Sequence, residues 1–433
     1  MSLSTQPYKG ARDFYPEDKR IQKYMFAKLR QVAESFGYQE YNAPLLEPLE
    51  LYSAKSGEEI VEKQLYSFED KAGRKLAIRP EMTPSVNRMV AGKRQELAYP
   101  LRWYSLPNLW RYERPQAGRL REHWQLNVDL FGVADTSADH EIIVIADRIL
   151  RSFGAQGDDF VIRINSRKLV DRFLKVYMGL DDSQIYQTSK LIDRWHKIER
   201  DEFHAQARDI LKNENQYKEL LELMESKSLD SLPVEVRDDN AAQELHKLMS
   251  MLAASGISSA HFDFSVIRGM DYYNGIVFEV FDTNQENVRS MFGGGRYDGL
   301  VELFGVEPVP TVGFGMGDVT LQNFLVTHDL LPHLQPEAHA VAILVGDTYR
   351  PAQSILDSLR AKGLNVAVDA TGRKLDSQIR HSAKSGVNYA IFIGNEEIST
   401  GHLKLRNLVT GEEKSLDIDQ LAENLLSTRD NQP

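Results

Sequence analysis

The feature that most constrains the fold is an alternation of apolar and polar residues between 122 and 131. The apolar set is Trp124, Leu126, Val128 and Leu130, and the polar set between them is His123, Gln125, Asn127 and Asp129. Successive side chains of a β-strand point to opposite faces, so this pattern predicts a strand with one packed face. Its other face is then free for polar chemistry.

Patterns elsewhere divide the chain into two regions and an insertion. Helical spacing predicts helices at 17–36 and 138–153, and strands are predicted at 160–165, 262–268, 275–282 and 312–317. The segment 168–255, rich in Lys, Glu, Leu and Gln, indicates a helical insertion. Pro332 and Pro336 mark 331–338 as a linker. Strands and helices alternate after it, which predicts a small α/β domain over 339–433.

Composition excludes several classes of protein. The 433 residues include 52 Lys and Arg against 63 Asp and Glu, so the net charge of −11 argues against a general nucleic-acid coat. The chain has no cysteine, which excludes disulfides, thiolate nucleophiles and cysteine-based zinc sites. No stretch approaches the roughly 20 apolar residues of a membrane span, and the first ten residues do not resemble a signal peptide. We expect a cytoplasmic protein that does not bind membranes.

The segment from 111 to 129 predicts a polar hairpin. Arg111 and Glu113 would share a face of its first strand, and Gln125 and Asp129 a face of its second. The loop between the strands carries three arginines, whose planar fork suits phosphate. The carboxylates could hold an ammonium group or a metal ion. The alternative is a solvated hairpin with ion pairs at its rim.

Two further segments carry candidate ligand-binding residues. Glu81 and Thr83 can present acceptors to one amine, although they could equally cap the start of a helix. Arg268, expected at the end of a strand, could neutralise carboxylate or phosphate charge. The pair Tyr272-Tyr273 offers a planar wall for a ring, or packs in a surface hairpin.

Glycines gather in two places, 293–295 and the alternate positions 313, 315 and 317. We expect a turn at the first group, and glycines at either place permit close approach of the backbone to a ligand. They form neither a dinucleotide fingerprint nor a Walker loop, and no HExxH motif is present. We therefore predict no metal-ligating residues.

Together these segments resemble the histidyl family of class II aminoacyl-tRNA synthetases over nearly the whole chain. The resemblance rests on Lys9–Pro16, the strand ending at Pro44, Leu65–Asp70, Arg79–Glu81, Arg111–Arg121, Arg268–Tyr273 and Gly294–Gly299. It implies an α+β catalytic domain at 1–330, an antiparallel sheet flanked by helices, and an anticodon-binding domain at 339–433. It also implies ATP-dependent activation of L-histidine, transfer to tRNA(His), Mg²⁺ as cofactor and a homodimer.

The resemblance also implies roles for particular residues. Glu81, Thr83, Gln125 and Asp129 match positions that hold histidine, and Tyr272, Tyr273 and Tyr297 lie on the aromatic side of that pocket. Arg111 and Arg268 match the arginines on either side of the reacting carboxylate and α-phosphate. The remaining positions implied for ATP are Glu113, Arg119, Arg121 and Gly315.

One position departs from the family pattern. Many relatives carry an arginine that clamps ATP where this chain has Thr320, and Arg119, Arg121 and Arg289 are candidates to replace its charge. An alternative function is that of a synthetase-like regulatory subunit of ATP phosphoribosyltransferase in histidine biosynthesis. A third is a non-catalytic module that binds RNA or an amino acid. The intact Arg268 segment and the full C-terminal domain argue against the regulatory subunit.

Overall fold

The computed structural model describes residues 3–53, 64–116, 118–267, 272–287 and 289–430. The chain forms two compact units. The first comprises Met1–Asp13 and Gln22–Leu331, and the second comprises Phe14–Ile21 and Pro332–Pro433. No described helix combines the length and the apolar character that crossing a membrane requires.

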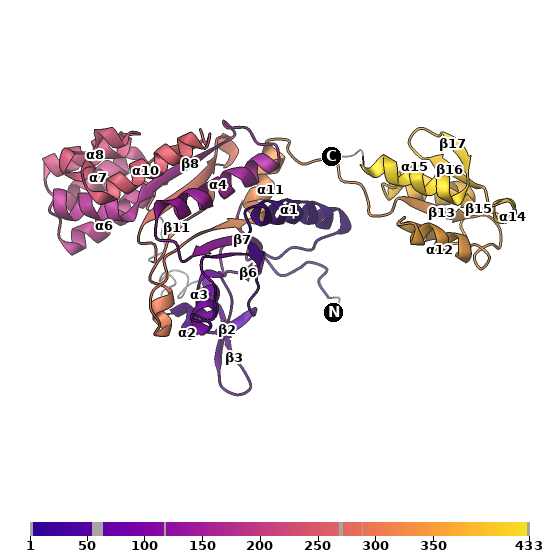
Figure 1. Ribbon diagram of the computed structural model, residues 1–433, viewed down its shortest axis with the longest axis horizontal. Coiled ribbons are helices and arrows are strands. Elements are labelled where there is room, and N and C mark those ends of the chain that lie inside the picture. Colours follow the sequence, from indigo (N-terminus) through magenta and orange to yellow (C-terminus); the bar gives the residue numbers. More distant parts are fainter. Residues whose placement is uncertain (1–2, 54–63, 117, 268–271, 288, 431–433) are drawn as a thin grey trace. The chain divides into compact units, whose positions relative to one another are not determined.

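A large sheet forms the centre of the first unit (Figure 1). Its strands are β1 (Gln39–Glu40), β5 (Leu101–Ser105), β6 (Asn108–Trp110), β7 (Glu122–Phe131), β8 (Phe160–Ser166), β9 (Ala260–Phe262), β10 (Ile276–Asp282), β11 (Ser290–Arg296) and β12 (Thr311–Gly317). Their order is β1-β5-β7-β12-β11-β10-β8-β9, and β6 also pairs with β7. Neighbours from β5 to β8 are antiparallel, whereas β1 and β9 pair in parallel with β5 and β8.

Helices cover the apolar face of this sheet. Leu126, Val128 and Leu130 of β7 are almost completely buried, as the alternation predicts. The helices α4 (Thr136–Ser152) and α11 (Asp318–Thr327) pack on β7 and β12. The helix α1 (Pro16–Ser35) buries Met25, Leu29 and Val32 along one side, and Gly37, with φ of +81°, follows its end.

The glycines at 293–295 lie inside β11, so the predicted turn is wrong. Gly293 and Gly295 pair with Gly315 and Gly313 across the antiparallel register. A Cβ on Gly294 would lie 2.0 Å from the Gly313 carbonyl oxygen, so the two strands approach more closely than side chains allow. Glycine marks backbone contact here rather than a change of direction.

Two further strand predictions need correction. β6 ends at Trp110, so Arg111 and Glu113 do not share a strand face. The Glu113 N–H instead donates to the Arg111 carbonyl at 2.8 Å, which curls the chain. β9 ends at Phe262 because the Asp263 carboxylate accepts the Ser265 N–H at 2.9 Å and turns the chain before residue 268.

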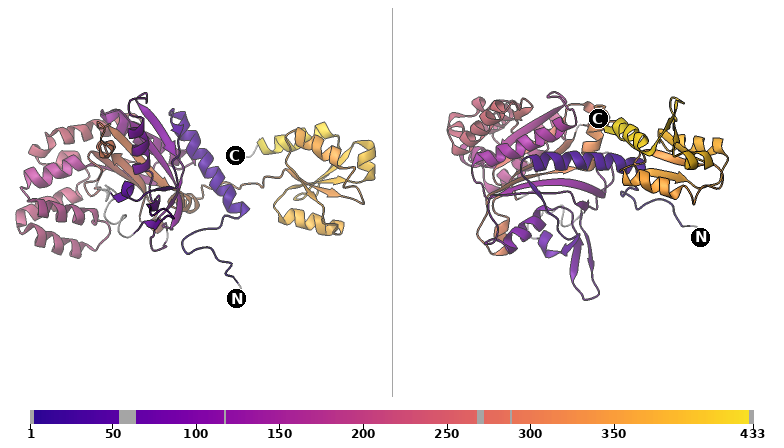
Figure 2. Two further views of the ribbon diagram at one scale, coloured as in Figure 1. Left: turned by 90° about the horizontal axis from the view of Figure 1, so that it is seen from below. Right: turned by 45° about the vertical axis from the view of Figure 1, so that its right-hand side comes forward.

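The rest of the first unit comprises a small sheet and the helical insertion. The small sheet has β2 (Leu46–Pro48), β3 (Tyr66–Glu69) and β4 (Lys75–Ile78), near α2 (Glu50–Ser53) and α3 (Thr83–Gly92). The insertion comprises α5 (Arg167–Asp171), α6 (Asp182–Asp193), α7 (Arg200–Leu211), α8 (Glu214–Glu225), α9 (Val234–Arg237) and α10 (Asn240–Ala254), and a π-helical stretch (Arg172–Tyr177) follows α5. α10 packs on α4, β8 and β9, and Figure 2 shows the insertion helices grouped together.

The second unit is a mixed sheet with helices. Its strands are β13 (Ala340–Leu344), β14 (Val366–Asp369), β15 (Tyr389–Ile393), β16 (Leu403–Asn407) and β17 (Glu413–Leu416), in the order β14-β13-β15-β16-β17. Its helices include α12 (Gln353–Ala361), α13 (Leu375–Lys384), α14 (Asn395–Thr400) and α15 (Ile418–Asp430). Leu356, Ile391 and Leu421 are buried in one core, so this unit has an interior of its own. The exact limits of the domains and of the linker stay a prediction.

Gly294→Ala should destabilise the chain by about 1–3 kcal/mol, because the new methyl group overlaps the backbone of β12. Gly92→Ala is the matched control. A Cβ there meets nothing within 4 Å, and alanine in a helix is better by at most about 1 kcal/mol. Denaturant unfolding of the full chain, followed by circular dichroism, measures both. Equal midpoints for the two variants would contradict the close contact.

Candidate active site

The polar face of β7 faces a floor of glycine. Asp129 lies opposite Gly313, and Gln125 lies opposite Gly317. A Cβ on Gly313 would lie 2.3 Å from the Asp129 carboxylate, and one on Gly315 would lie 2.2 Å from the Gln125 amide nitrogen. These glycines therefore leave room for side chains of β7 to cross over the neighbouring strand. A ligand lying there would meet backbone rather than side chains.

Asp129 is a buried carboxyl group at one end of this floor. It accepts a hydrogen bond from the Tyr297 hydroxyl, and its side chain is 4% exposed. Burial raises the pKa of Asp129 from 3.8 to about 7, although the hydrogen bond from Tyr297 acts in the opposite direction. The folded state then keeps a proton that the unfolded chain loses. This group therefore makes the folded state less stable as the pH rises from about 4 toward 7.

Tyr297 links that carboxyl group to two further tyrosines and Glu81. The ring centres of Tyr272 and Tyr273 are 4.7 Å apart, and those of Tyr272 and Tyr297 are 5.7 Å apart. The Tyr272 hydroxyl donates to Glu81 at 3.5 Å, and Glu81 is 3% exposed. Two carboxyl groups and three rings are thus assembled from distant segments. Such a cluster of carboxyl groups and rings suits a small cation with a planar ring.

Thr83 begins α3 and does not cap it. The residue before the helix is Met82, and no side chain there accepts a helix N–H. The capping alternative for Glu81 and Thr83 is therefore wrong, and Glu81 faces Tyr272 instead. Pro84 occupies the first turn, where its missing N–H costs nothing.

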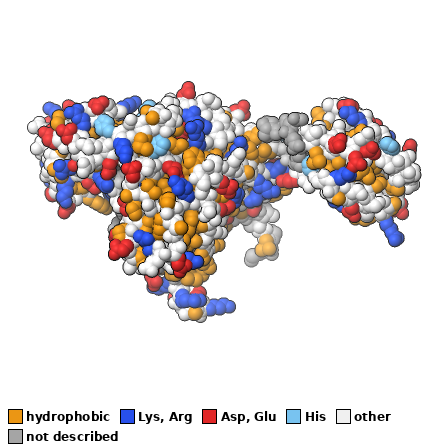
Figure 3. All heavy atoms as spheres, viewed as in Figure 1, with side chains coloured by type: hydrophobic (Ala, Val, Ile, Leu, Met, Phe, Trp, Pro, Cys, Tyr) orange, Lys and Arg blue, Asp and Glu red, His pale blue; other side chains and the backbone are white. Residues whose placement is uncertain are grey.

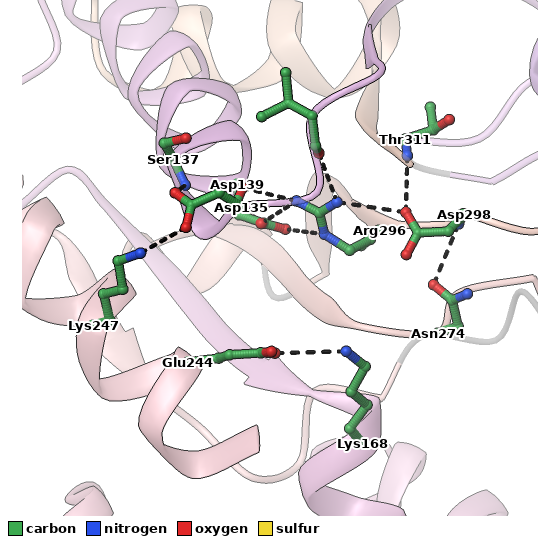
Figure 4. Close-up of polar contacts among 11 residues, drawn as sticks. Asp135, Ser137, Asp139, Lys168, Glu244, Lys247, Asn274, Arg296, Asp298 and Thr311 are labelled. Carbon is green, nitrogen blue, oxygen red and sulfur yellow. Dashed lines mark hydrogen bonds and ion pairs between the residues drawn. The ribbon is translucent and has the colours of Figure 1, made fainter. Parts of the chain in front are cut away.

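Tyr297 is held in place through its neighbours Arg296 and Asp298, whose contacts are drawn in Figure 4. Its neighbour Arg296 is buried and donates to Asp139 of α4 at 2.5 and 3.2 Å, and to the Val133 carbonyl at 3.0 Å. The Tyr297 N–H donates to the Thr311 carbonyl at 2.8 Å, while Asp298 accepts the Thr311 N–H. Bonds on both sides of Tyr297 therefore fix its direction.

The arginine-rich loop lies at the other end of the floor. Arg111 is half-buried and its Nε donates to the Pro80 carbonyl at 2.9 Å. Among the described residues its two terminal nitrogens make no hydrogen bond and remain available to an anion. Arg119 pairs with Glu113 at 3.3 Å. Arg121 donates to the Tyr8 hydroxyl at 2.6 Å and lies 4.1 Å from the centre of the Tyr112 ring.

The structure thus brings together some predicted residues and separates others. Asp129, Glu81 and the three tyrosines meet at one end. Gln125 lies four residues along the same strand, about 13 Å away. Glu113, Arg119 and Arg121 lie in the loop before β7, and Arg268 falls outside the described residues. Arg111 begins that loop but reaches the carbonyl of Pro80, the residue before Glu81.

Several polar residues of the site were not predicted. The Tyr41 hydroxyl is buried and lies beside Asp129. Burial raises the pKa of Tyr41, and the negative charge of Asp129 raises it further. Arg12 pairs with Asp318 at 2.7 Å, and Asp318 also accepts the Trp124 N–H. Burial together with the charges of Arg111 and Arg12 lowers the pKa of His123 to about 3. Of these, only His123 carried a signal in the sequence, through its place in the alternation.

Comparison with known proteins identifies the class of this fold and site. A family model described as histidyl-tRNA synthetase matches residues 10–319, and one described as an anticodon-binding domain matches residues 339–428. The structure of histidyl-tRNA synthetase from Nostoc sp. PCC 7120 superimposes with a TM-score of 0.84 at 24% identity, covering 99% of this chain and all of that one. These findings confirm the predicted class II synthetase fold with its helices and C-terminal domain.

Curated relatives identify the family within that class. Histidine–tRNA ligase of Leptospira biflexa is 42% identical over 411 residues, which is 94% of each chain. That of Thermoplasma volcanium is 38% identical over 424 residues, covering 97% of this chain and 98% of its own. The chain belongs to the histidyl-tRNA synthetase family.

We expect the binding of a cation such as histidine beside Asp129 to depend on pH. A cationic group bound beside Asp129 requires the ionised carboxylate, so affinity should fall by up to tenfold per pH unit below about 7. Asp129→Asn should bind more weakly and lack this component. Tyr297→Phe removes a bond that stabilises the ionised form, so its midpoint should move to higher pH. Calorimetric titration with histidine between pH 5 and 8 measures this, and identical profiles for all three proteins would contradict it.

Proposed function

We propose that this chain activates L-histidine with ATP and transfers the histidyl group to the 3′ end of tRNA(His). The observation that carries the proposal is the cluster of Asp129, Glu81 and the tyrosines at one end of a glycine-floored sheet face. Full-length relatives named histidine–tRNA ligase support the same activity.

Histidine binds by its cationic and aromatic groups. Glu81 and Asp129 supply carboxylates for the ammonium and imidazole groups, and Thr83 and Gln125 supply further polar contacts. Tyr272, Tyr273 and Tyr297 flank the ring. Asp129 and Tyr297 are at most 4% exposed. A ring bound beside them would be shielded from water, and the low local dielectric would strengthen each polar interaction.

The first chemical step joins two anions. A histidine carboxylate oxygen forms a bond to the α-phosphorus of ATP, and the bond from that phosphorus to the β-phosphate oxygen breaks, releasing pyrophosphate. Arg111 and Arg268 neutralise the charge gathered at this centre, and stabilisation of this kind lowers the barrier electrostatically. No side chain forms a covalent intermediate. In the second step the histidyl group passes to a ribose hydroxyl of the tRNA.

The site also suits Mg²⁺. The described residues hold no group of three or more His, Asp or Glu side chains able to bind a metal alone. Mg²⁺ is usually bound through one or two carboxylates together with substrate phosphates and water. Glu279 lies on the polar face opposite Gly293, and its position there supports it as a carboxylate that would share the ion. Bound there, Mg²⁺ would draw negative charge from the phosphates.

The second unit supports the tRNA partner. Residues 339–428 match the anticodon-binding model, so we propose that this unit binds the anticodon arm. The cytoplasm, where charged tRNA is used, is the proposed location. The insertion could contact the acceptor arm or simply cover the core. Acidic and basic side chains mix on its visible face in Figure 3, without a single-sign patch.

The regulatory-subunit alternative has less support. A structure described as an ATP phosphoribosyltransferase regulatory subunit/histidyl-tRNA synthetase from Bacillus halodurans aligns with a TM-score of 0.75 at 23% identity. That likeness concerns the fold alone. Relatives with 35–42% identity over nearly the full length are named histidine–tRNA ligase.

Pyrophosphate exchange tests the proposed activity. The purified chain should exchange labelled pyrophosphate into ATP only when histidine is present, and no exchange at saturating ATP would refute the proposal. Arg268→Ala should abolish this exchange and leave histidine binding measurable, because it removes charge from the reacting centre and not from the pocket. Arg350→Ala, an exposed arginine in the second unit, is the control. Unchanged turnover in Arg268→Ala would contradict its role.

A homodimer is the proposed assembly. Leu45 and Leu46, which follow Pro44, are 44% and 43% exposed, and Phe68 of β3 is 44% exposed. Figure 3 shows hydrophobic side chains gathered over this part of the molecule. Apolar side chains grouped on a surface favour contact with another chain, and β1 is a two-residue edge strand that such a contact would protect.

Sedimentation tests the dimer. The unmodified chain should sediment at twice the mass of one chain, and Leu46→Glu should shift it to the monomer because it places a charge in the interface. Val409→Glu, at a residue 76% exposed in the second unit, should remain dimeric. A monomeric unmodified chain would refute the proposal.

A further inference from the structure

Three segments meet at one edge of the large sheet, the one formed by the ends of its central strands rather than by an outer strand. Because β7 and β11 run antiparallel to β12, their first residues lie at the edge where β12 ends. The loop 111–121 precedes β7, Arg289 precedes β11, and α11 follows β12. The Thr320 hydroxyl donates to the Met291 carbonyl at 2.8 Å, which joins α11 to β11 two residues after Arg289.

The tip of the arginine-rich loop lies against this edge. Gln116 and Arg119 exchange backbone hydrogen bonds of 3.0 and 2.9 Å, and Gly118 between them has φ of +76°. A Cβ on Gly118 would lie 3.5 Å from the Thr320 methyl group. Arg289 donates from Nη2 to the Gln116 side-chain oxygen at 3.1 Å. The loop tip is therefore held between Thr320 and Arg289.

The three arginines near this edge differ in their partners. Arg119 is paired with the Glu113 carboxylate. Arg121 donates to the Glu113 carbonyl and to Tyr8, and it stacks on Tyr112. Arg289 is exposed, and within the described ranges its guanidinium has no carboxylate within 4.0 Å. Its hydrogen bond to a neutral amide leaves its charge uncompensated.

Thr320 cannot supply what Arg289 offers. Its hydroxyl hydrogen is used within the protein, toward the Met291 carbonyl at 2.8 Å or the Gly317 carbonyl at 3.2 Å. A hydroxyl carries no positive charge, whereas a guanidinium is a cation whose two parallel N–H groups can bind two phosphate oxygens at once.

We propose that Arg289 binds the terminal phosphates of ATP, exchanging its hydrogen bond with Gln116 for the phosphate oxygens. This inference rests on the proposed function and names a residue that handles its nucleotide. Arg289 lies six residues before Gly295, whose partner Gly313 faces Asp129, so it is about 20 Å along the strands from the histidine end. Arg289 therefore contacts the departing pyrophosphate. It stabilises the negative charge that develops on the pyrophosphate as its bond to the α-phosphorus breaks.

Nucleotide binding without histidine tests the proposal. With the full-length chain and Mg²⁺, Arg289→Gln should weaken ATP binding at least tenfold in calorimetry and leave AMP binding within twofold, because AMP lacks the terminal phosphates. Arg289→Lys should fall between, since it keeps the charge and loses the fork. Gln116→Ala is the control. It removes the partner of Arg289 in the absence of nucleotide and keeps the charge, so ATP affinity should be equal or tighter.

Three outcomes would overturn the proposal. They are unchanged ATP affinity in Arg289→Gln, equal loss of ATP and AMP binding, or an equal loss in Gln116→Ala, which would indicate a structural pair. Unfolding midpoints within 2 °C of the unmodified chain should accompany the result, as about 1 kcal/mol moves the midpoint by a few degrees. The exchange assay separates this proposal from the function. Arg289-dependent ATP binding without histidine-dependent exchange refutes only the function, whereas normal exchange with an unchanged KM for ATP in Arg289→Gln refutes only the role of Arg289.

Discussion

The close backbone contact between β11 and β12 is the constraint on which the rest of the site depends. Glycines at 293–295 and at 313 and 315 remove the side chains that would keep these strands and β7 apart. Asp129 can then lie over Gly313 and reach Tyr297, and its burial there alters its affinity for a proton. A floor without side chains is also what allows one extended ligand to lie along the strands.

The two ends of that floor use different physical chemistry. At the Asp129 end, carboxyl groups and rings are nearly inaccessible to water, so recognition depends on desolvated polar contacts. At the loop end, Arg111, Arg119 and Arg289 are half-buried or exposed, and their charges act on a ligand that is itself highly charged. In the proposed function, the enclosed end provides selectivity for the amino acid, and the loop end provides charge for the triphosphate.

Much of this architecture could be predicted from local patterns. The alternation along β7 correctly predicts which residues lie on its apolar face and which on its polar face. The segment that contains Pro332 and Pro336 is followed, as predicted, by an α/β fold with its own core. The glycines of β11 were misjudged because glycine alone does not distinguish a turn from a strand in backbone contact. Arg12 and Asp318, which are 306 residues apart, meet only through the topology, and no local pattern could have joined them. The roles assigned to individual residues in the site remain predictions.

The buried pair of Arg296 and Asp139 connects the two faces of the sheet. Its guanidinium belongs to the segment that aims Tyr297 at the pocket, and its carboxylate belongs to a helix on the far side. Removing Arg296 would leave the buried Asp139 carboxylate without this cation, which costs about 3–5 kcal/mol, whereas removing Asp139 would leave Arg296 with its longer ion pair to Asp298 at 3.5 Å. If the proposed role of Tyr297 holds, a single change in α4 would disturb amino-acid selection without touching the ligand. Positions 139 and 296 are expected to covary in evolution, and redesign of the pocket for another amino acid must keep them together.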